Sequence, residues 1–553
     1  MAEIGLAIAG LVGAVDVCWK WGKKLVETCQ AFRSADSRLL ESIVRLEVRW
    51  LRIEDQLQTL RKMEPLLDEC HRDVQQRTLE ILLAKLKVAD SKLAGLIETA
   101  DLAPGSQPQP RFKKWKYLIT RDALLESISE LETWQQMFDP GWFLMMRIAR
   151  SEVDGLLEAT AKQLVGSSRK GPSASLPAAR YVRRALNSDI IDTDRPTIYL
   201  PMEGLVAGSV RPVPFSTAST ALRADNHQGV LLDPVTCTTR SHVNAVIRDI
   251  RNFARSLSHA DPFTFGLLEC KGILEEEEGD EASAEAGAIP ASSAGLAFVF
   301  RLPSTHSHVE SLRGRLLGGR EREHDSLSER FALARQVAVA VSYVHLYGFV
   351  HKNIRPETVL LCHPSFHGYR HGEGPGGAGI ASEFATLVGF DVLRNSEGKT
   401  YRLGDDDWEK NLYRHPQRQG RSVQVDYEMR HDIYSLGVCL LEIGLWVTFV
   451  RYWAGSAAPL LGPGLGVSEG DVSGPELLMD PEGVKNLLLR LARGPLRRKM
   501  GTRYGKVVET CLTCLEKDNV DFGDEKESQD EDGVAVGVRY IEKVVARLGE
   551  ITV

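Results

Sequence analysis

Residues 341–361 constrain the fold of this 553-residue chain more than any other stretch. They read Val-Ser-Tyr-Val-His-Leu-Tyr-Gly-Phe-Val-His-Lys-Asn-Ile-Arg-Pro-Glu-Thr-Val-Leu-Leu, so an apolar helical pattern stops at Gly348 and a short apolar run follows. Glycine commonly follows the last residue of a helix, and proline does not continue one. The stretch therefore predicts the end of a helix, a short buried strand and a polar loop that Pro356 closes.

The composition is that of a globular protein, and the length suits two to four domains. The net charge of −7 argues against bulk nucleic-acid binding. The nine cysteines lie mostly inside apolar patterns, which predicts free thiols in a reducing cytosol rather than a disulfide framework. The Cys511-x-x-Cys514 pair is predicted to pack in a core, because a zinc site needs four ligands.

Residues 1–165 carry helical patterns throughout. Within residues 36–62 the apolar side chains recur in steps of three and four, which predicts one buried helix face. These side chains are Leu39, Ile43, Leu46, Trp50, Ile53, Leu57 and Leu60. Similar patterns predict helices over residues 3–32, 73–99 and 120–138, and Asp139-Pro140-Gly141 predicts a break before a last helix. We expect a bundle of four or five helices over residues 1–165, then a linker over residues 166–195.

Residues 4–17 are almost entirely aliphatic with glycine and alanine. Glu3 precedes them and Asp16 lies among them, so the basic start of a signal peptide is missing. The run is also shorter than the ~20 apolar residues of a membrane-spanning helix. The resting chain is therefore predicted to keep this segment as a buried helix.

From residue 196 the pattern changes to mixed strands and helices. Strands are predicted at residues 197–200, 229–232, 265–274 and 296–302, and helices at residues 241–257 and 327–347. The acidic residues 275–294 read as a loop. The fold class is thus multidomain, with an all-α bundle followed by an α+β domain.

Residues 351–358, His-Lys-Asn-Ile-Arg-Pro-Glu-Thr, resemble the catalytic loop of protein kinases, His-Arg-Asp-Leu-x-x-x-Asn. Tyr413-Arg-His-Pro-Gln resembles the end of an activation segment, and residues 427–438 resemble the central helix whose Asp braces that loop. The resemblance implies a bilobal kinase-like domain, with an N-lobe at residues 196–303 and a C-lobe at residues 304–553. It also implies a structural frame that consists of Pro356, Pro416, Asp432 and Gly437.

The residues that carry kinase chemistry are replaced in this sequence. Asn353 stands where the resemblance places the catalytic Asp, and an amide has no basic carboxylate. Thr358 replaces a metal-binding Asn, and Arg355 replaces a Lys. Gly389-Phe390-Asp391 stands at the magnesium-binding Asp-Phe-Gly, with its carboxylate two places late. The degenerate positions are His351, Lys352, Asn353, Arg355, Thr358, Gly389, Phe390 and Asp391.

The nucleotide-binding elements are equally weak. No lysine lies between Lys170 and Lys271, so the lysine that grips the nucleotide phosphates is absent. Gly204-x-x-x-Gly208 is the best candidate for a phosphate-binding loop, although a plain turn explains it as well. The run Asp405-Asp406-Asp407 leaves a metal-binding interpretation open beside that of a solvated loop.

The glycine-rich start, the helix order and the Trp134…Phe138-Asp-Pro-Gly-Trp142 element resemble fungal HeLo and HeLo-like domains. These are the N-terminal bundles of prion-controlled cell-death proteins that act in heterokaryon incompatibility. The resemblance implies a first helix that can enter a membrane through Ile4, Leu6, Ile8, Leu11, Val12 and Val15. It also implies headgroup contacts by Lys113, Lys114 and Lys116. A core helix and a solvated basic turn are the alternative interpretation.

Together these features predict a signalling or cell-death effector, laid out like the mixed lineage kinase domain-like protein. Its pseudokinase would sense a protein partner and control a membrane-targeting bundle. The expected partners are that protein, an anionic membrane and a second copy bound through the bundle, with no nucleic acid. We expect no metal, no cofactor and a cytoplasmic location with movement to a membrane on activation. The alternatives are an atypical Ser/Thr kinase that uses ATP and magnesium, and a soluble scaffold.

Overall fold

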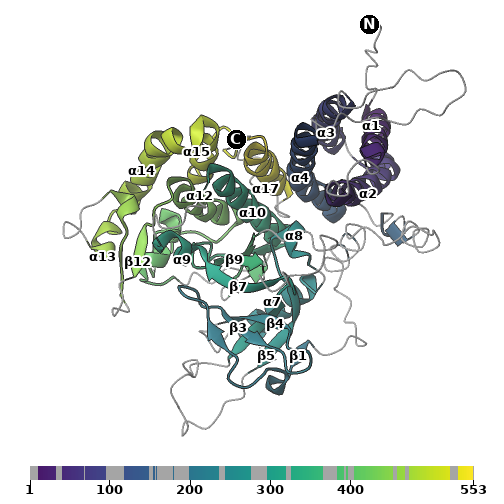
Figure 1. Ribbon diagram of the computed structural model, residues 1–553. Coiled ribbons are helices and arrows are strands. Elements are labelled where there is room, and N and C mark those ends of the chain that lie inside the picture. The colour runs from purple at the N-terminus through teal and green to yellow at the C-terminus, as the bar shows by residue number, and fades with distance from the viewer. Residues whose placement is uncertain are drawn as a thin grey trace, which may run out of the picture. The chain divides into compact units, whose positions relative to one another are not determined.

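The computed structural model divides the chain into two compact units, Met1–Arg184 and Ala185–Val553 (Figure 1). The first unit is helical and the second is mixed α/β. The structure describes residues 10–32, 40–67, 69–94, 117–148, 198–235, 243–258, 260–275, 295–318, 326–364, 383–390, 394–395, 404–421, 423–452, 458–466, 473–523 and 534–551, with seven single positions between 153 and 183. The finer domain bounds stay a prediction.

Four helices build the described part of the first unit. They are α1 (Gly10–Phe32), α2 (Leu40–Met63), α3 (Glu69–Ala94) and α4 (Tyr117–Ile148), with the short η2 (Glu64–Leu66) after α2. The predicted apolar face of α2 is confirmed from Ile43 to Leu60, since all six of its described members are buried. Gly22 of α1 lies flat against the Trp50 ring, because a Cβ at this glycine would fall 1.8 Å from Trp50 Cη2.

Helix α4 continues through Pro140, so the predicted break at residues 139–141 is wrong. Packing explains the difference. Trp134 and Phe138 stack at 4.6 Å between ring centroids and are buried together with Trp142 and Phe143 on the same helix. Asp139 accepts hydrogen bonds from Arg52 Nη2 at 2.6 Å and from Gln56 Nε2 at 2.7 Å. These contacts on both sides of Pro140 outweigh the hydrogen bond that a proline removes from a helix.

A six-stranded sheet opens the second unit in the order β1-β5-β6-β4-β3-β2. Its strands are β1 (Tyr199–Leu200), β2 (Arg211–Pro212), β3 (Ser219–Leu222), β4 (Gly229–Val235), β5 (Glu269–Glu275) and β6 (Leu296–Arg301). Strands β2 and β3 were not predicted from the sequence. Strand β5 was predicted to begin at residue 265, which is too early, because that residue still belongs to the short helix α8 (Pro262–Phe265), which Asp261 caps. Helix α7 (Val243–Ser256) packs Phe253 against Phe298 of β6, with 6.0 Å between ring centroids.

Helices dominate the rest of the second unit around the buried α12 (Met429–Leu445). Before it come β7 (His306–Ser311), α9 (Leu312–Leu317), α10 (Leu327–Leu346), β8 (Phe349–Val350), β9 (Val359–Pro364), β10 (Phe384–Leu387), β11 (Arg394–Asn395), α11 (Trp408–Asn411) and η8 (Pro416–Arg418). After it come β12 (Val450–Tyr452), β13 (Pro459–Leu461), η9 (Pro463–Leu465), α13 (Gly474–Leu477), α14 (Pro481–Leu491), η10 (Ala492–Leu496), α15 (Arg497–Leu512), α17 (Val534–Tyr540), η11 (Ile541–Ala546) and α18 (Arg547–Gly549). The predicted helix end, strand and loop at residues 341–361 are confirmed as α10, β8 and the connection to β9.

Asp139→Ala is expected to lower the free energy of unfolding of the first unit by ~2–4 kcal/mol, because it leaves the buried Gln56 and the largely buried Arg52 without this carboxylate. Urea unfolding followed by helical circular dichroism measures the loss. Asp73→Ala is the matched control, since Asp73 pairs with Arg77 on an exposed helix surface and its loss should cost under ~0.5 kcal/mol. Equal effects of the two substitutions would show that Asp139 does not hold α2 and α4 together.

Candidate functional site

The loop at residues 351–358 is held by one buried carboxylate, Asp432 in the first turn of α12. Its Oδ2 accepts a hydrogen bond from the backbone N–H of His351 at 2.7 Å, and its Oδ1 accepts one from the N–H of Lys352 at 2.9 Å. Lys352 adopts a left-handed backbone with φ of 66°, which a residue other than glycine keeps only where its surroundings enforce it. The two bonds to Asp432 supply that enforcement.

The protonation states of Asp432 and His351 follow from their burial and their hydrogen bonds. Burial opposes ionisation of Asp432, but hydrogen bonds from His345 and Tyr427 hold its pKa below the usual value. Burial lowers the pKa of His351 to about 4, so its ring is neutral at pH 7. The neutral ring suits its partners, because Nε2 lies 3.0 Å from the Val388 carbonyl oxygen and Nδ1 accepts from the Asn353 N–H at 3.2 Å. The ring thus donates from Nε2 and accepts at Nδ1.

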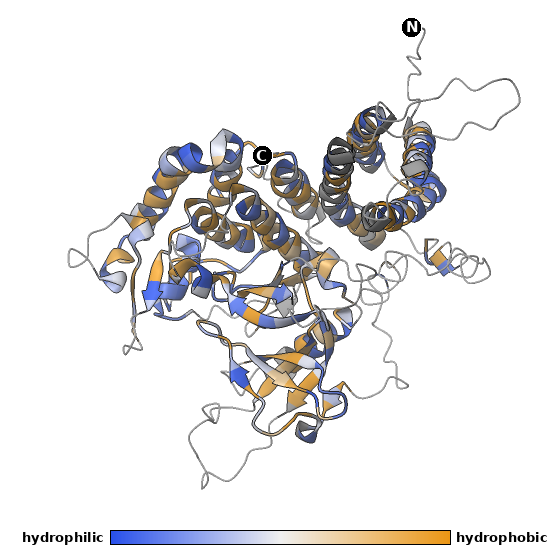
Figure 2. Cartoon of the chain, viewed as in Figure 1, coloured by the Kyte–Doolittle hydropathy of each residue, from blue (hydrophilic) through white to orange (hydrophobic). Residues whose placement is uncertain are grey.

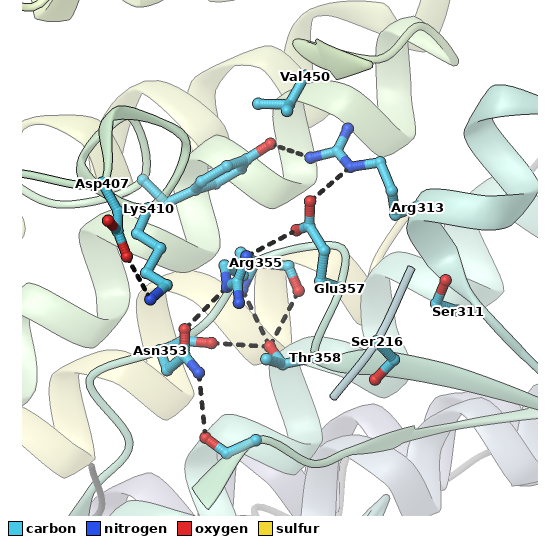
Figure 3. A network of polar contacts seen from close by, with 12 residues as sticks. Ser216, Ser311, Arg313, Asn353, Arg355, Glu357, Thr358, Asp407, Lys410 and Val450 are labelled. Atoms are coloured by element: carbon cyan, nitrogen blue, oxygen red, sulfur yellow. Dashed lines mark hydrogen bonds and ion pairs between the residues drawn. The ribbon is translucent and has the colours of Figure 1, made fainter. Parts of the chain in front are cut away.

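The side chains of the loop bind one another (Figure 3). Asn353 Oδ1 accepts a hydrogen bond from Arg355 Nε at 2.9 Å, and Asn353 Nδ2 donates to the Gly389 carbonyl at 3.3 Å. Thr358 Oγ1 lies 2.7 Å from the Asn353 carbonyl oxygen, to which it donates. Arg355 Nη1 lies 3.7 Å from Glu357 Oε2. The side chains of Asn353, Arg355, Glu357 and Thr358 are all buried, so their polar groups bond within the protein.

The segment after β10 closes on this loop. Gly389 has a φ of 83°, and a Cβ at this position would lie 2.3 Å from Thr358 Cγ2. A side chain at position 389 therefore fits only if Thr358 or the backbone shifts. Phe390 lies against His351 at 4.8 Å and Phe253 at 4.7 Å between ring centroids. Asp391 lies outside the described residues.

A second buried carboxylate, which the sequence analysis missed, reaches this segment from the sheet. Asp233 of β4 is fully buried, and its Oδ2 accepts hydrogen bonds from Gly389 N at 2.9 Å and from Phe390 N at 3.1 Å. The signal in the sequence was a single acid at the end of the apolar run Val-Leu-Leu-Asp233. Because a buried carboxylate needs hydrogen-bond donors, that acid pointed to a partner elsewhere in the chain.

The hairpin turn between β2 and β3 also docks on the helical part of this unit. Ser311 Oγ, at the start of α9, donates to the Pro214 carbonyl at 2.6 Å. Phe215 has a positive φ of 58°, and its ring lies 5.5 Å from that of Tyr452. The predicted Gly204-x-x-x-Gly208 loop is not this turn, because Gly204 ends the short η4 (Met202–Gly204) and both glycines precede β2.

Arg313 lies at the centre of a buried charge cluster beside the loop (Figure 3). Its Nε donates to Glu357 Oε1 at 2.9 Å and its Nη1 donates to Glu442 Oε1 at 2.8 Å. Tyr413 OH donates to Glu442 Oε2 at 2.7 Å. Burial alone would lower the Arg313 pKa, but Glu357 and Glu442 raise it well above the usual value, so the guanidinium stays charged. The cluster ties α9, the loop and α12 together.

Some of the other predicted site residues are buried in a core, and the rest lie outside the described residues. Leu11 and Val15 of α1 are buried and Val12 is half-buried, whereas Ile4, Leu6 and Ile8 lie outside the described residues. Lys113, Lys114 and Lys116 lie outside them as well. Cys511 and Cys514 are buried free thiols, as predicted.

The frame residues occupy structural positions in the second unit. The Pro356 carbonyl accepts from Arg313 N at 3.1 Å, and Pro416 begins η8 behind a His415 cap. Gly437 lets α12 approach α15, because a Cβ there would lie 2.8 Å from Cys511 Cβ.

The three aspartates at 405–407 each pair with a different basic side chain, namely Arg414, Arg421 and Lys410. In the described part of the chain, no three His, Cys, Asp or Glu side chains are grouped as a metal site requires. Within the same residues, no helix has the length and apolar content to cross a bilayer. Comparison with known families and with curated proteins finds no match for this sequence.

Gly389→Ala is expected to destabilise the second unit more than Gly420→Ala does, by ~1–3 kcal/mol of overpacking. Both glycines have a positive φ, but a Cβ at Gly420 would meet nothing within 4 Å, so this control isolates the backbone term. Thr358→Ser keeps the hydroxyl and removes Cγ2, and it should restore part of the loss in the Gly389→Ala background. Urea unfolding of these three variants and of the unmodified chain gives the comparison, and equal losses at the two glycines would refute the steric contact.

Proposed function

We propose that this chain is a signalling or cell-death effector built from a HeLo-like bundle and a kinase-like domain that does not catalyse phosphoryl transfer. In this proposal the second unit binds a protein partner and controls whether the first unit reaches a membrane. The chain would be cytoplasmic at rest and would move to a membrane on activation.

The order of elements in the second unit supports a bilobal kinase-like fold. A sheet with α7 and the short α8 between β4 and β5 is followed by β7, then α9 and α10, then the loop at residues 351–358. The strands on both sides of that loop pair antiparallel, β8 with β11 and β9 with β10. Asp432 holds the loop backbone, which is the task of the central-helix Asp in protein kinases.

The observation that carries the absence of catalysis is the carboxylate of Asp233. Protein kinases place the phosphate-binding lysine at the end of a Val-Ala-Ile-Lys strand. In the proposed alignment that strand is β4, which reads Val-Leu-Leu-Asp233. A buried carboxylate repels nucleotide phosphates instead of binding them, and this one is already bonded to Gly389 and Phe390.

The remaining catalytic positions support the same conclusion. Asn353 has no carboxylate to accept a proton, and Arg355 is held by Asn353 and Glu357. Gly389 has no side chain to bind a metal, and its contact with Thr358 leaves no room for one. Catalytic residues that act as a unit lose most of the rate enhancement when any member is removed.

Burial of the first helix supports a two-state bundle. Leu11, Ala14, Val15 and Cys18 of α1 are buried in the first unit, so membrane insertion through this face requires that α1 leave the bundle. In this proposal the second unit controls the equilibrium between a state with α1 buried in the bundle and a state with α1 released.

Nucleotide binding is the first test of the second unit. We expect no thermal shift of the full chain with ATP, with or without magnesium, because Asp233 replaces the phosphate ligand. A ligand present at about 100 times its Kd would stabilise the folded chain by ~2.7 kcal/mol. A thermal shift detects a change of this size readily. A magnesium-dependent shift would favour the atypical kinase instead, and phosphotransfer by Asn353→Ala would then be measured.

Dye leakage from anionic vesicles tests the first unit. We expect residues 1–184, which form the first compact unit, to cause leakage and Leu11→Glu to abolish it, because a charge on the apolar face of α1 opposes insertion. Leu57→Ala is the control, since it weakens the bundle core while leaving α1 intact, and it should not reduce leakage. Absence of both leakage and vesicle binding in the unmodified bundle would favour the soluble scaffold.

A further inference from the structure

A strongly basic stretch in the second unit has no role in the site described above. Residues 483–508 contain eight lysines and arginines and no acidic residue, in a chain whose net charge is −7. They form most of α14, all of η10 and most of α15. Such a local excess of one sign marks a surface that interacts with the opposite sign.

The helices present these cations to solvent because their other side is packed. Leu488, Leu496 and Tyr504 are fully buried, and Gly444 of α12 lies within van der Waals distance of Leu496 and Tyr504. Hydrophilic residues line the outer turns of α15 (Figure 2). The exposed cations, which we call the basic surface, are Arg490, Arg493, Arg498, Lys499, Arg503 and Lys506.

Two members of the basic surface have a structural task. Arg493 Nε contacts Glu509 Oε1 at 2.7 Å, and Lys499 Nζ donates to the Leu445 carbonyl at 2.7 Å, where it caps the end of α12. The structure gives the other four no carboxylate partner in the described part of the chain. These four exposed cations are therefore available to an external anion.

The character of the surface selects the kind of anion. In residues 481–512 no large apolar or aromatic side chain is exposed, so the surface offers no ring on which nucleic-acid bases stack. A layer of anionic headgroups needs only an exposed, net-positive surface.

We propose that the basic surface binds anionic lipid headgroups. This inference adds a membrane contact on the second unit to the proposed function, and it does not require insertion of α1. It also offers the second signal that stable membrane attachment generally needs, since one weak contact gives only reversible binding.

The test is co-sedimentation of the full chain with phosphatidylcholine vesicles that contain or lack phosphatidylserine. Each surface cation strengthens binding to an anionic membrane about fivefold, so the triple variant Arg498→Gln, Arg503→Gln, Lys506→Gln should bind about a hundredfold more weakly. Raising the salt concentration should weaken the unmodified chain in the same direction. The control is a second triple variant, Arg211→Gln, Arg248→Gln, Arg255→Gln, which removes the same charge from exposed positions elsewhere in this unit. Thermal denaturation of both variants verifies folding.

Leu11→Glu separates this inference from the proposed function. In the Leu11→Glu background we expect leakage to be lost and phosphatidylserine-dependent binding to remain, with a further loss in the triple variant. Absence of phosphatidylserine-dependent binding in that background, or equal losses in the two triple variants, would overturn the lipid assignment. Binding to an RNA or an acidic peptide that depends on the three residues, without vesicle binding, would also overturn it and assign the surface to that partner.

Discussion

The carboxylate of Asp432 fixes the position of the loop at residues 351–358, and most of the site depends on it. Two of its hydrogen bonds go to consecutive backbone N–H groups, and two more come from His345 and Tyr427. An unpaired buried charge of this kind would be strongly unfavourable, so the four donors and the carboxylate stabilise each other. The strained backbone of Lys352 and the placement of Asn353 beside Gly389 follow from this anchor, whereas the neutral ring of His351 follows from burial.

A second set of buried charges organises the parts of the same unit that are far apart in the sequence. Arg313 joins α9 to the loop through Glu357 and to α12 through Glu442. Asp233 joins the sheet to the segment after β10. Such pairs contribute little net stability compared with apolar packing, but a misfolded arrangement that left one partner alone would cost several kcal/mol (~3–5). Their effect is to specify one arrangement of the sheet and the helices.

Local patterns in the sequence predicted the helices well and the tertiary contacts poorly. The apolar face of α2 and the helix, strand and loop at residues 341–361 follow from spacing alone, because each is a local pattern. The break at Pro140 was wrong, because Arg52 and four buried aromatic side chains hold α4 together across it. Strands β2 and β3 were missed because Pro, Ser and Thr make them read as turns. Asp233 was missed because its partners lie about 156 residues away and no period in a sequence encodes such a contact.

The contact between Gly389 and Thr358 couples the residue types that these two positions accept. Any side chain at position 389 would place its Cβ 2.3 Å from the Thr358 methyl group, on a backbone whose φ of 83° already favours glycine. A side chain at position 389 is therefore tolerated better when position 358 holds a smaller residue. The effects of substitutions at the two positions are thus expected to be non-additive, as is usual for side chains in direct contact.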